Sequence, residues 1–151
     1  MNISIISPGK FKKNPPFEEI FNFYKKRINL DIDLKEIKTF SFEKKKKLLF
    51  EKTEILKHLK PTDYIVVLDK DGKMLSSIGF SLFLKKKMIE RTKRICFLIG
   101  SDLGLDLSIK KSYQTISLGK KTWPHQLVRI MLIEQIYRSL EIIKNSSYHK
   151  Q

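Results

Sequence analysis

Hydrophobic positions along the chain follow two different spacings. Short apolar and β-branched runs, typical of strands, occur at residues 3–7, 34–40, 64–69, 94–100 and 113–118. Longer segments with the three-to-four-residue spacing of helices lie at 16–28, 42–59, 77–90 and 124–144, with a short turn near 107–111. Strands that alternate with helices predict an α/β layer fold with a mostly parallel sheet.

Two of the expected strands are apolar without alternation, which is typical of central strands covered on both faces. They are Tyr-Ile-Val-Val-Leu-Asp at 64–69 and Ile-Cys-Phe-Leu-Ile-Gly at 95–100. Parallel sheets bind ligands beyond the carboxyl ends of their strands. The candidate site therefore lies in the loops at 70–76, 100–105 and 119–124.

The composition adds a strong positive charge. The 151 residues carry 31 Lys plus Arg against 16 Asp plus Glu, a formal net charge of +15. A field of this sign attracts polyanions, so nucleic acid is the expected partner. A second interpretation of the charge stays open. Most of the excess is lysine, and an AT-rich genome raises the lysine content of its proteins, so the charge could simply keep the surface solvated.

Other features narrow the class of protein. The length and 41% hydrophobic content suffice for one domain over residues 1–151. The single cysteine, Cys96, is interpreted as a small buried hydrophobe, and it allows no disulfide within the chain. The chain has no apolar stretch of about 18 residues, and residues 1–7 are too short for a signal peptide, so we expect a cytoplasmic protein without a membrane partner. Three scattered histidines lack metal-ligand spacing, so no metal is expected.

Two loops follow the central strands. The glycines of Gly100-Ser101-Asp102-Leu103-Gly104 would let a ligand approach the backbone closely. Their spacing fits neither a dinucleotide fingerprint nor a P-loop, so by itself this loop is better interpreted as a plain turn. Asp69-Lys70-Asp71-Gly72-Lys73 contains an Asp-Gly pair, which predicts a turn at the rim of a pocket.

The segment 116–126 is the most informative. A strand ends there, a polar loop with Gly119 follows, and Thr122 with Pro124 starts the last helix. Amides at the start of that helix and the loop backbone could line a cofactor pocket. His125 is expected in the first turn, directed at the strand ends, although a lone histidine is more often structural than catalytic.

The last helix, at 124–144, has too many apolar residues for one stripe. A symmetric homodimer would cover the surplus, and burial within one monomer is the alternative. Glu134 and Arg138 have the spacing and order of a helical ion pair, which leaves open whether Arg138 meets RNA. The closing Tyr148-His149-Lys150 is by default frayed, but these side chains could together stack on a base, titrate near neutrality and hold a phosphate.

Longer motifs run through the C-terminal half. They are Val67-Leu68-Asp69, Gly72-Lys73-Met74-Leu75-Ser76-Ser77, Phe97-Leu98-Ile99-Gly100, Ser117-Leu118, Thr122-Trp123-Pro124-His125-Gln126-Leu127, Arg129, Leu132-Ile133-Glu134-Gln135-Ile136-Tyr137-Arg138 and Tyr148-His149-Lys150. In these residues, and in Gly9-Lys10 near the N-terminus, the chain resembles the pseudouridine N3-methyltransferase H family of large-subunit ribosomal RNA, within the SPOUT superfamily. Among the departures, Ser101 stands where the family commonly has a second glycine, and Asp102-Leu103 and Lys120-Lys121 differ from its usual residues.

The resemblance implies a trefoil-knotted α/β fold and an obligate homodimer with its active site at the interface. It implies a methyl donor, S-adenosylmethionine, in contact with Leu68, Gly100, Ile116, Ser117, Leu118, Gly119, Lys120 and Lys121. The implied reaction is methylation of N3 of a pseudouridine in large-subunit rRNA within the assembled ribosome.

Methylation of an imide nitrogen needs a group that takes its proton or stabilises the resulting anion. His149 is the first candidate for this catalytic role, and His125 is the second. Tyr148 is expected to stack on the base. The residues expected to hold phosphate, RNA or the developing charge are Arg138, Lys150 and Arg129.

Two other functions stay open at this point. A non-enzymatic RNA-binding or ribosome-assembly protein would carry the same charge but would not bind a methyl donor saturably. A nucleotide-binding α/β protein would prefer ATP, although the sequence lacks a P-loop.

Overall fold

The computed structural model describes residues 1–11, 15–41 and 43–150. Strands and helices alternate through these ranges. In chain order they are β1 (Asn2–Pro8), α1 (Pro15–Lys25), β2 (Asp31–Ile37), α2 (Lys44–Leu56), β3 (Tyr64–Met74), α3 (Ser77–Ile89), β4 (Arg94–Ile99), α4 (Leu107–Ser112), β5 (Gln114–Ser117) and α5 (His125–Ile143). Every expected strand and helix is present. Phe42, the first residue of the second expected helix, and Gln151 lie outside the described residues.

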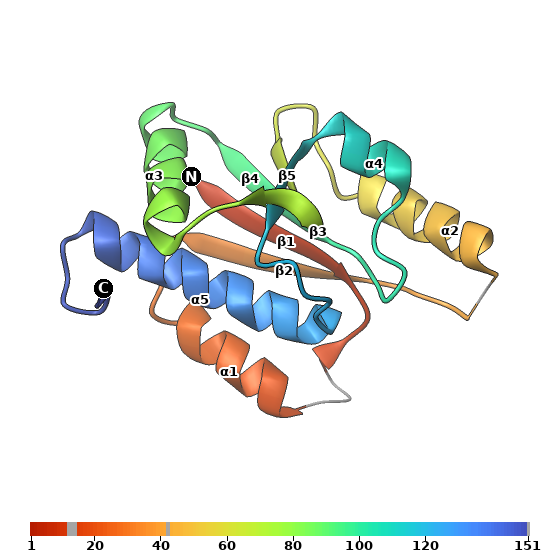
Figure 1. Ribbon diagram of the computed structural model, residues 1–151, viewed down its shortest axis with the longest axis horizontal. Coiled ribbons are helices and arrows are strands. Elements are labelled where there is room, and N and C mark those ends of the chain that lie inside the picture. Colours follow the sequence, from red (N-terminus) through yellow and green to blue (C-terminus); the bar gives the residue numbers. More distant parts are fainter. Residues whose placement is uncertain (12–14, 42, 151) are drawn as a thin grey trace.

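The strands form one sheet in the order β2-β1-β4-β3-β5, and each neighbouring pair is parallel (Figure 1). The two strands that the sequence identifies as central, β3 and β4, each have a strand on both sides. The prediction of an α/β fold with a mostly parallel sheet is confirmed. Because the strands are parallel, their carboxyl ends meet at one edge. The implied trefoil knot stays a prediction.

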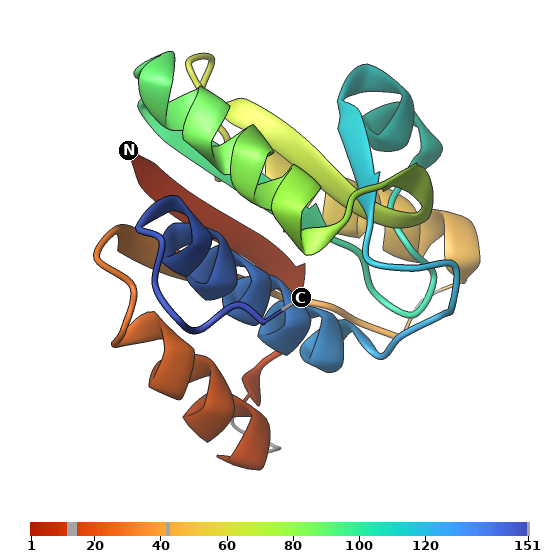
Figure 2. The same cartoon turned by 60° about the vertical axis from the view of Figure 1, so that its left-hand side comes forward.

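Successive residues of a strand point to opposite faces of the sheet and pack in two hydrophobic clusters, one on each face. Val66 of β3 and Phe97 of β4 pack in the cluster under α1, α3 and α5. Their neighbours Val67 and Leu98 pack in the cluster under α2 and α4. All four side chains have no exposed surface, and each such burial stabilises the fold by about 2 kcal/mol. Figure 2 shows α3 and α5 side by side over the sheet.

The edge strand β2 begins and ends earlier than the run at 34–40 predicts. Its register is fixed by β1, since Ile32 pairs with Ile3 and Ile37 pairs with Pro8. Ile32 and Ile37 are buried, whereas Phe40 is 47% exposed. The bounds of β2 are therefore set by its pairing with β1 and not by its own apolar pattern.

The turn expected at 69–73 is wrong, because these residues remain within β3. The pairing of β3 with β5 shifts register there, so that Leu68 and Lys73 both lie opposite Ile116. A Cβ at Gly72 would lie 2.7 Å from the carbonyl carbon of Ile116, so only glycine fits this close approach. The Asp-Gly pair thus serves an irregularity inside a strand.

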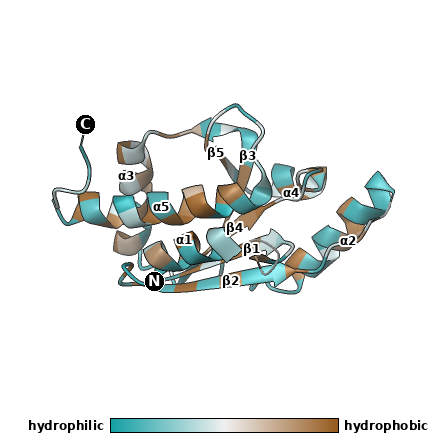
Figure 3. Ribbon diagram, turned by 90° about the horizontal axis from the view of Figure 1, so that it is seen from below, coloured by the Kyte–Doolittle hydropathy of each residue, from teal (hydrophilic) through white to brown (hydrophobic). Residues whose placement is uncertain are grey.

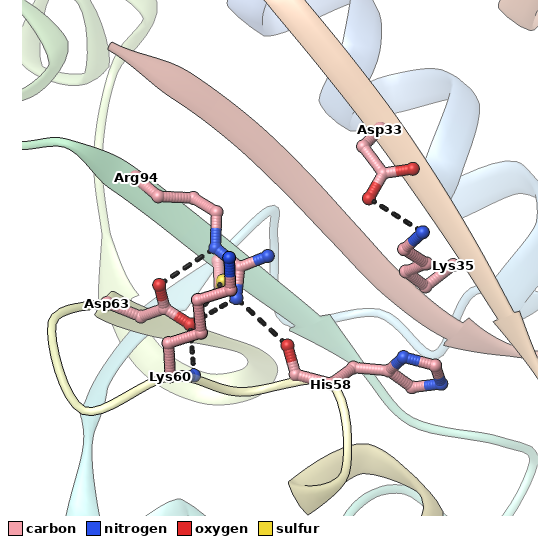
Figure 4. A network of polar contacts seen from close by, with 7 residues as sticks. Asp33, Lys35, His58, Lys60, Asp63 and Arg94 are labelled. Carbon is pink, nitrogen blue, oxygen red and sulfur yellow. Dashed lines mark hydrogen bonds and ion pairs between the residues drawn. The ribbon is translucent and has the colours of Figure 1, made fainter.

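A polar network fixes the loop before β3 at the amino end of the sheet (Figure 4). Arg94 donates from Nε to Oδ1 of Asp63 at 2.8 Å and from Nη2 to the carbonyl oxygen of His58 at 2.9 Å. The backbone N–H of Lys60 donates to Oδ2 of Asp63 at 2.7 Å. Burial alone would raise the pKa of Asp63, but the hydrogen bonds from Arg94 and Lys60 outweigh it and hold that pKa below its ordinary value.

Cys96 is fully buried, as the sequence indicates. Burial raises the pKa of its thiol to about 12, and the neighbouring Asp63 adds to this effect. The thiol therefore stays protonated and acts as a small core side chain.

Candidate active site

A pocket of about 280 Å³ opens at the carboxyl ends of β4 and β5, beside residues 68–70 in the middle of β3, and we call it the strand-end pocket. Its walls are this part of β3, the loop after β4, α4 through Lys110, the loop between β5 and α5, and the first turns of α5. The residues that line it are Leu68, Asp69, Lys70, Ile99, Gly100, Ser101, Asp102, Leu103, Gly104, Lys110, Leu118, Gly119, Lys121, Thr122, Trp123, His125 and Val128.

Glycines allow the backbone itself to form much of this wall. A Cβ at Gly100 would lie 2.4 Å from the carbonyl carbon of Gly104, so the two ends of this loop approach each other more closely than any side chain allows. Gly104 has a φ of +75° and Gly119 a φ of +120°, which other residues rarely adopt. The loop after β4 is therefore a tight turn and also a pocket wall.

The bend after β5 is held by its own side chain. Ser117 Oγ accepts from the Gly119 amide at 3.1 Å and donates to the Gly119 carbonyl oxygen at 2.9 Å. These bonds keep Leu118 and Gly119 at the pocket.

The pocket has apolar and charged sides. Leu68 and Val128 contribute aliphatic surface, and Trp123 contributes an aromatic ring that is 37% exposed. Asp69 Oδ2 lies 2.9 Å from Nζ of Lys110 on α4, so this carboxylate is held by a neighbouring cation. Such a mixture suits a ligand with a flat base and charged groups.

His125 opens α5 and lines the strand-end pocket, as the sequence predicts. Its ring lies against the bend after β1, because a Cβ at Gly9 would be 3.4 Å from Nε2. Burial lowers the pKa of His125, and the positive charge of Arg129 lowers it further. The ring is therefore mainly neutral at neutral pH.

The C-terminal tail does not fray but folds back onto the far end of α5 (Figure 1). Arg138 donates from Nε to Oε1 of Glu134 at 2.9 Å, which confirms the expected helical pair. Nη1 of Arg138 lies 3.3 Å from Nδ1 of His149. Tyr148 donates its hydroxyl to Glu134 at 3.2 Å. Arg138, Tyr148 and His149 thus form one cluster, which we call the tail cluster.

Contacts with Glu134 and burial raise the pKa values of Arg138 and Tyr148, respectively. The hydrogen bond with Glu134 raises the pKa of Arg138, which remains a cation. Burial raises the pKa of Tyr148, and contacts with Tyr24 and Glu134 raise it further. The phenol is therefore protonated at neutral pH and serves as a hydrogen-bond donor and an aromatic surface.

The tail cluster and the strand-end pocket are far apart within one chain. Arg138 lies thirteen positions after His125 on the same helix, which corresponds to about 20 Å along its axis. One chain therefore does not bring Arg138, Tyr148 or His149 to the pocket that His125 lines.

A second cavity, of about 820 Å³, lies among α1, α3, α5 and the end of β5 and borders the tail cluster through Glu134. We call it the helix groove. Its lining residues are Ile20, Tyr24, Met74, Leu75, Ser76, Ser77, Phe80, Ile116, Ser117, Leu118, Gly119, Ile130, Met131, Glu134 and Gln135. Ile20 is 45% exposed and Met74 is 57% exposed. Figure 3 shows hydrophobic residues along α5, and the exposed side chains of Ile20 and Met74 give this cavity an apolar surface that meets solvent.

A family model described as "Predicted SPOUT methyltransferase" matches residues 1–149. The chain belongs to the SPOUT methyltransferase family. A relative from Caldicellulosiruptor bescii is 41% identical over 155 aligned residues, which cover 98% of this chain and 99% of that protein. Relatives from Flavobacterium psychrophilum and Parabacteroides distasonis are each 38% identical over an alignment of 160 positions, which covers all of both chains. All three are named ribosomal RNA large subunit methyltransferase H.

The donor-binding positions implied by the SPOUT resemblance, apart from Lys120, line the two cavities. Those that line the strand-end pocket are Leu68, Gly100, Leu118, Gly119 and Lys121. Ile116 and Ser117 are buried and line the helix groove instead. Lys120 is exposed and lines neither cavity.

The expected RNA contact of Arg129 is wrong, because its side chain has no exposed surface. Nε donates to Ser7 at 2.9 Å and Nη2 donates to the carbonyl oxygens of Pro8 and Gly9. Burial lowers the pKa of Arg129 to about 10, while Glu36 opposes this shift. This SPOUT chain uses Arg129 to hold the bend after β1 against α5.

Some residues that line the strand-end pocket were not predicted from the sequence to have a role there. Trp123 belongs to the specific Thr122–Gln126 motif, and that motif is the sequence feature that could have identified it as a pocket residue. Ser101 lies in the loop after β4 and Asp69 lies within β3, but no spacing rule singled them out. Val128 is one of many apolar residues of α5, and only the fold shows that it faces the pocket.

In the described ranges, no group of three or more His, Cys, Asp or Glu side chains is placed to hold a metal ion. Within the same ranges, no helix combines the length and hydropathy that crossing a bilayer requires.

Proposed function

We propose that this SPOUT methyltransferase transfers a methyl group from S-adenosylmethionine to N3 of a pseudouridine in large-subunit rRNA, within the assembled ribosome. The observation that carries the proposal is the full-length similarity to relatives named ribosomal RNA large subunit methyltransferase H. The net charge of +15 supports a polyanionic substrate. A ribosomal substrate implies that the protein acts in the cytoplasm.

The strand-end pocket fits the proposed donor. Its volume is close to the lower end of the usual range for small-molecule sites, about 300 Å³. Leu68, Val128 and Trp123 offer apolar surface to an adenine ring, and at Gly100 the pocket wall is backbone without a side chain. When bound, S-adenosylmethionine supplies an electrophilic methyl group on a sulfonium. The contribution of the pocket is to fix position and exclude water.

A homodimer would complete this site. The helix groove presents apolar side chains of α1 and α5 that nothing in the same chain covers fully. It borders the tail cluster, so an interface formed here would place each tail next to the partner subunit. The separation of about 20 Å between His125 and Arg138 in one chain makes a second copy the economical way to join tail and pocket.

The tail cluster would act on the acceptor base. Tyr148 provides an aromatic face for stacking, and Lys150 is exposed and free to meet a phosphate. Arg138 adds a fixed positive charge near any negative charge that forms on the base. His149 would take the imide proton or stabilise the anion that its loss leaves.

His125 remains the second candidate for the proton. It lines the strand-end pocket, and its lowered pKa keeps the ring neutral and able to accept a proton. Replacement of each histidine separately distinguishes the two candidates.

The test is to incubate the protein with radiolabelled S-adenosylmethionine and, in parallel, intact ribosomes, separate subunits or naked rRNA. We expect label only in large-subunit rRNA and the highest incorporation with intact ribosomes. A non-enzymatic assembly protein would bind the particles and transfer no label, which would contradict the proposal.

A further inference from the structure

The loop after β4 is tied to α2 by a buried carboxylate. Glu51 on α2 is 2% exposed. Its Oε2 accepts from the hydroxyl of Ser101 at 2.8 Å, and its Oε1 accepts from the hydroxyl of Thr39 at 2.7 Å. Hydrogen bonds to a charged acceptor are stronger than neutral ones, and a buried carboxylate is costly to leave unpaired. Glu51 therefore fixes both of its partners.

A second contact comes from the preceding turn of the same helix. Nζ of Lys47 lies 2.6 Å from Oδ1 of Asp102, and Lys47 precedes Glu51 by four positions, so both side chains project from one face of α2. Lys47 lowers the pKa of Asp102. The Asp102 side chain is 71% exposed, so this ion pair is the weaker of the two ties.

Ser101 passes the restraint on to the pocket wall. Its Oγ accepts from the amide of Leu103 at 3.4 Å, and its carbonyl oxygen accepts from the amide of Gly104 at 2.9 Å. Leu103 and Gly104 both line the strand-end pocket. With a glycine at each end, the loop depends on Ser101 and its partner Glu51 for a fixed shape.

We propose that Glu51 is a positioning residue that holds residues 100–104 in their donor-binding shape through Ser101. This inference rests on the proposed function, since it takes the strand-end pocket as the donor site. A wall ordered before binding spares the ligand the entropic cost of ordering it. Loss of the tie therefore weakens donor affinity and leaves the RNA side of the site unchanged.

The experiment compares matched hydroxyl deletions at the two partners of Glu51. Ser101→Ala removes the tie to the loop, Ser101→Thr restores a hydroxyl, and Thr39→Val removes the other bond outside the pocket. The dissociation constant for S-adenosylmethionine is measured by calorimetry, and amide hydrogen exchange is measured for residues 100–104. The KM for ribosomes is measured for the same variants.

We expect Ser101→Ala to raise the dissociation constant about tenfold and to speed exchange in the loop, with no change in the KM for ribosomes. Ser101→Thr should recover most of the affinity, and Thr39→Val should stay within about twofold of the wild type. Glu51→Gln combined with Ser101→Ala gives a double-mutant cycle, in which we expect the two losses not to add.

Three results would overturn the inference: wild-type affinity and loop exchange in Ser101→Ala, an equal loss in Thr39→Val, or additive losses in the cycle. Failure of the wild-type protein to bind S-adenosylmethionine would overturn the proposed function and this inference together. The first three results, by contrast, leave the proposed function intact.

Discussion

Nη1 of Arg138 lies 3.3 Å from Nδ1 of His149. A guanidinium has only donors, so Nδ1 must be the acceptor, and a neutral His149 ring then carries its proton on Nε2. In this state the free side of the ring is a hydrogen-bond donor. The geometry therefore favours His149 as a group that stabilises the anion of the base over one that removes the proton.

His149→Ala should lower methylation of ribosomes about 100-fold, while affinity for S-adenosylmethionine changes little, because His149 is assigned to the acceptor base and is not among the residues that line the strand-end pocket. His149→Gln, which keeps an N–H donor, should retain more activity than His149→Ala. Single-turnover methylation and calorimetry measure the two effects. His58→Ala, at the opposite end of the sheet, is the control. Equal losses of methylation and donor affinity would remove the assigned role of His149.

The protein should be a dimer at micromolar concentration, and Ile20→Glu should make it monomeric, because a carboxylate in the helix groove would lose hydration on association. Light scattering measures the mass. The monomer should still bind the donor but fail to methylate ribosomes. Leu49→Glu, on an exposed position of α2, should remain dimeric. A monomeric wild-type protein with full activity would refute the shared site.

Arg129→Met should lower the free energy of unfolding by about 3 kcal/mol, because it leaves the carbonyl oxygens of Pro8 and Gly9 without their buried donor. Urea unfolding followed by circular dichroism measures this loss. Arg27→Met, at an exposed position, should change stability by no more than about 0.5 kcal/mol. An Arg129→Met protein of normal stability but weak ribosome binding would instead support an RNA contact.

Acid should destabilise the protein through the Asp63–Arg94 pair. The folded pKa of Asp63 is below its unfolded value, so its contribution is fully present above about pH 4 and is lost as pH falls through the folded pKa. Asp63→Asn should cost about 2 kcal/mol at pH 7 and should flatten the decline in stability between about pH 5 and pH 2. Urea unfolding across this range measures both effects. Asp31→Asn, at an exposed residue, should keep the wild-type dependence of stability on pH. If Asp63→Asn also kept the wild-type dependence, the Asp63–Arg94 pair would not be the cause of the acid sensitivity.

The order of strands and helices was readable from the sequence, because a buried strand and an amphipathic helix each impose a local spacing on apolar residues. The same logic placed the strand-end pocket, since parallel strands bring their carboxyl ends together. Leu68, Gly100 and Gly119, three of the positions that the resemblance assigns to the methyl donor, line that pocket, and their contact with the donor stays a prediction. His125 and the Glu134–Arg138 pair also followed from positions close in sequence.

Only the tertiary structure determined the features that depend on contacts between residues distant in sequence. Arg129 is a buried anchor only because Ser7, 122 positions earlier, lies beside it. Glu51 meets Ser101 across 50 positions, and β3 continues past Gly72 because β5 pairs with it. Local spacing records which face of an element is apolar, but it holds no information about which distant partner satisfies a charge or fixes a register.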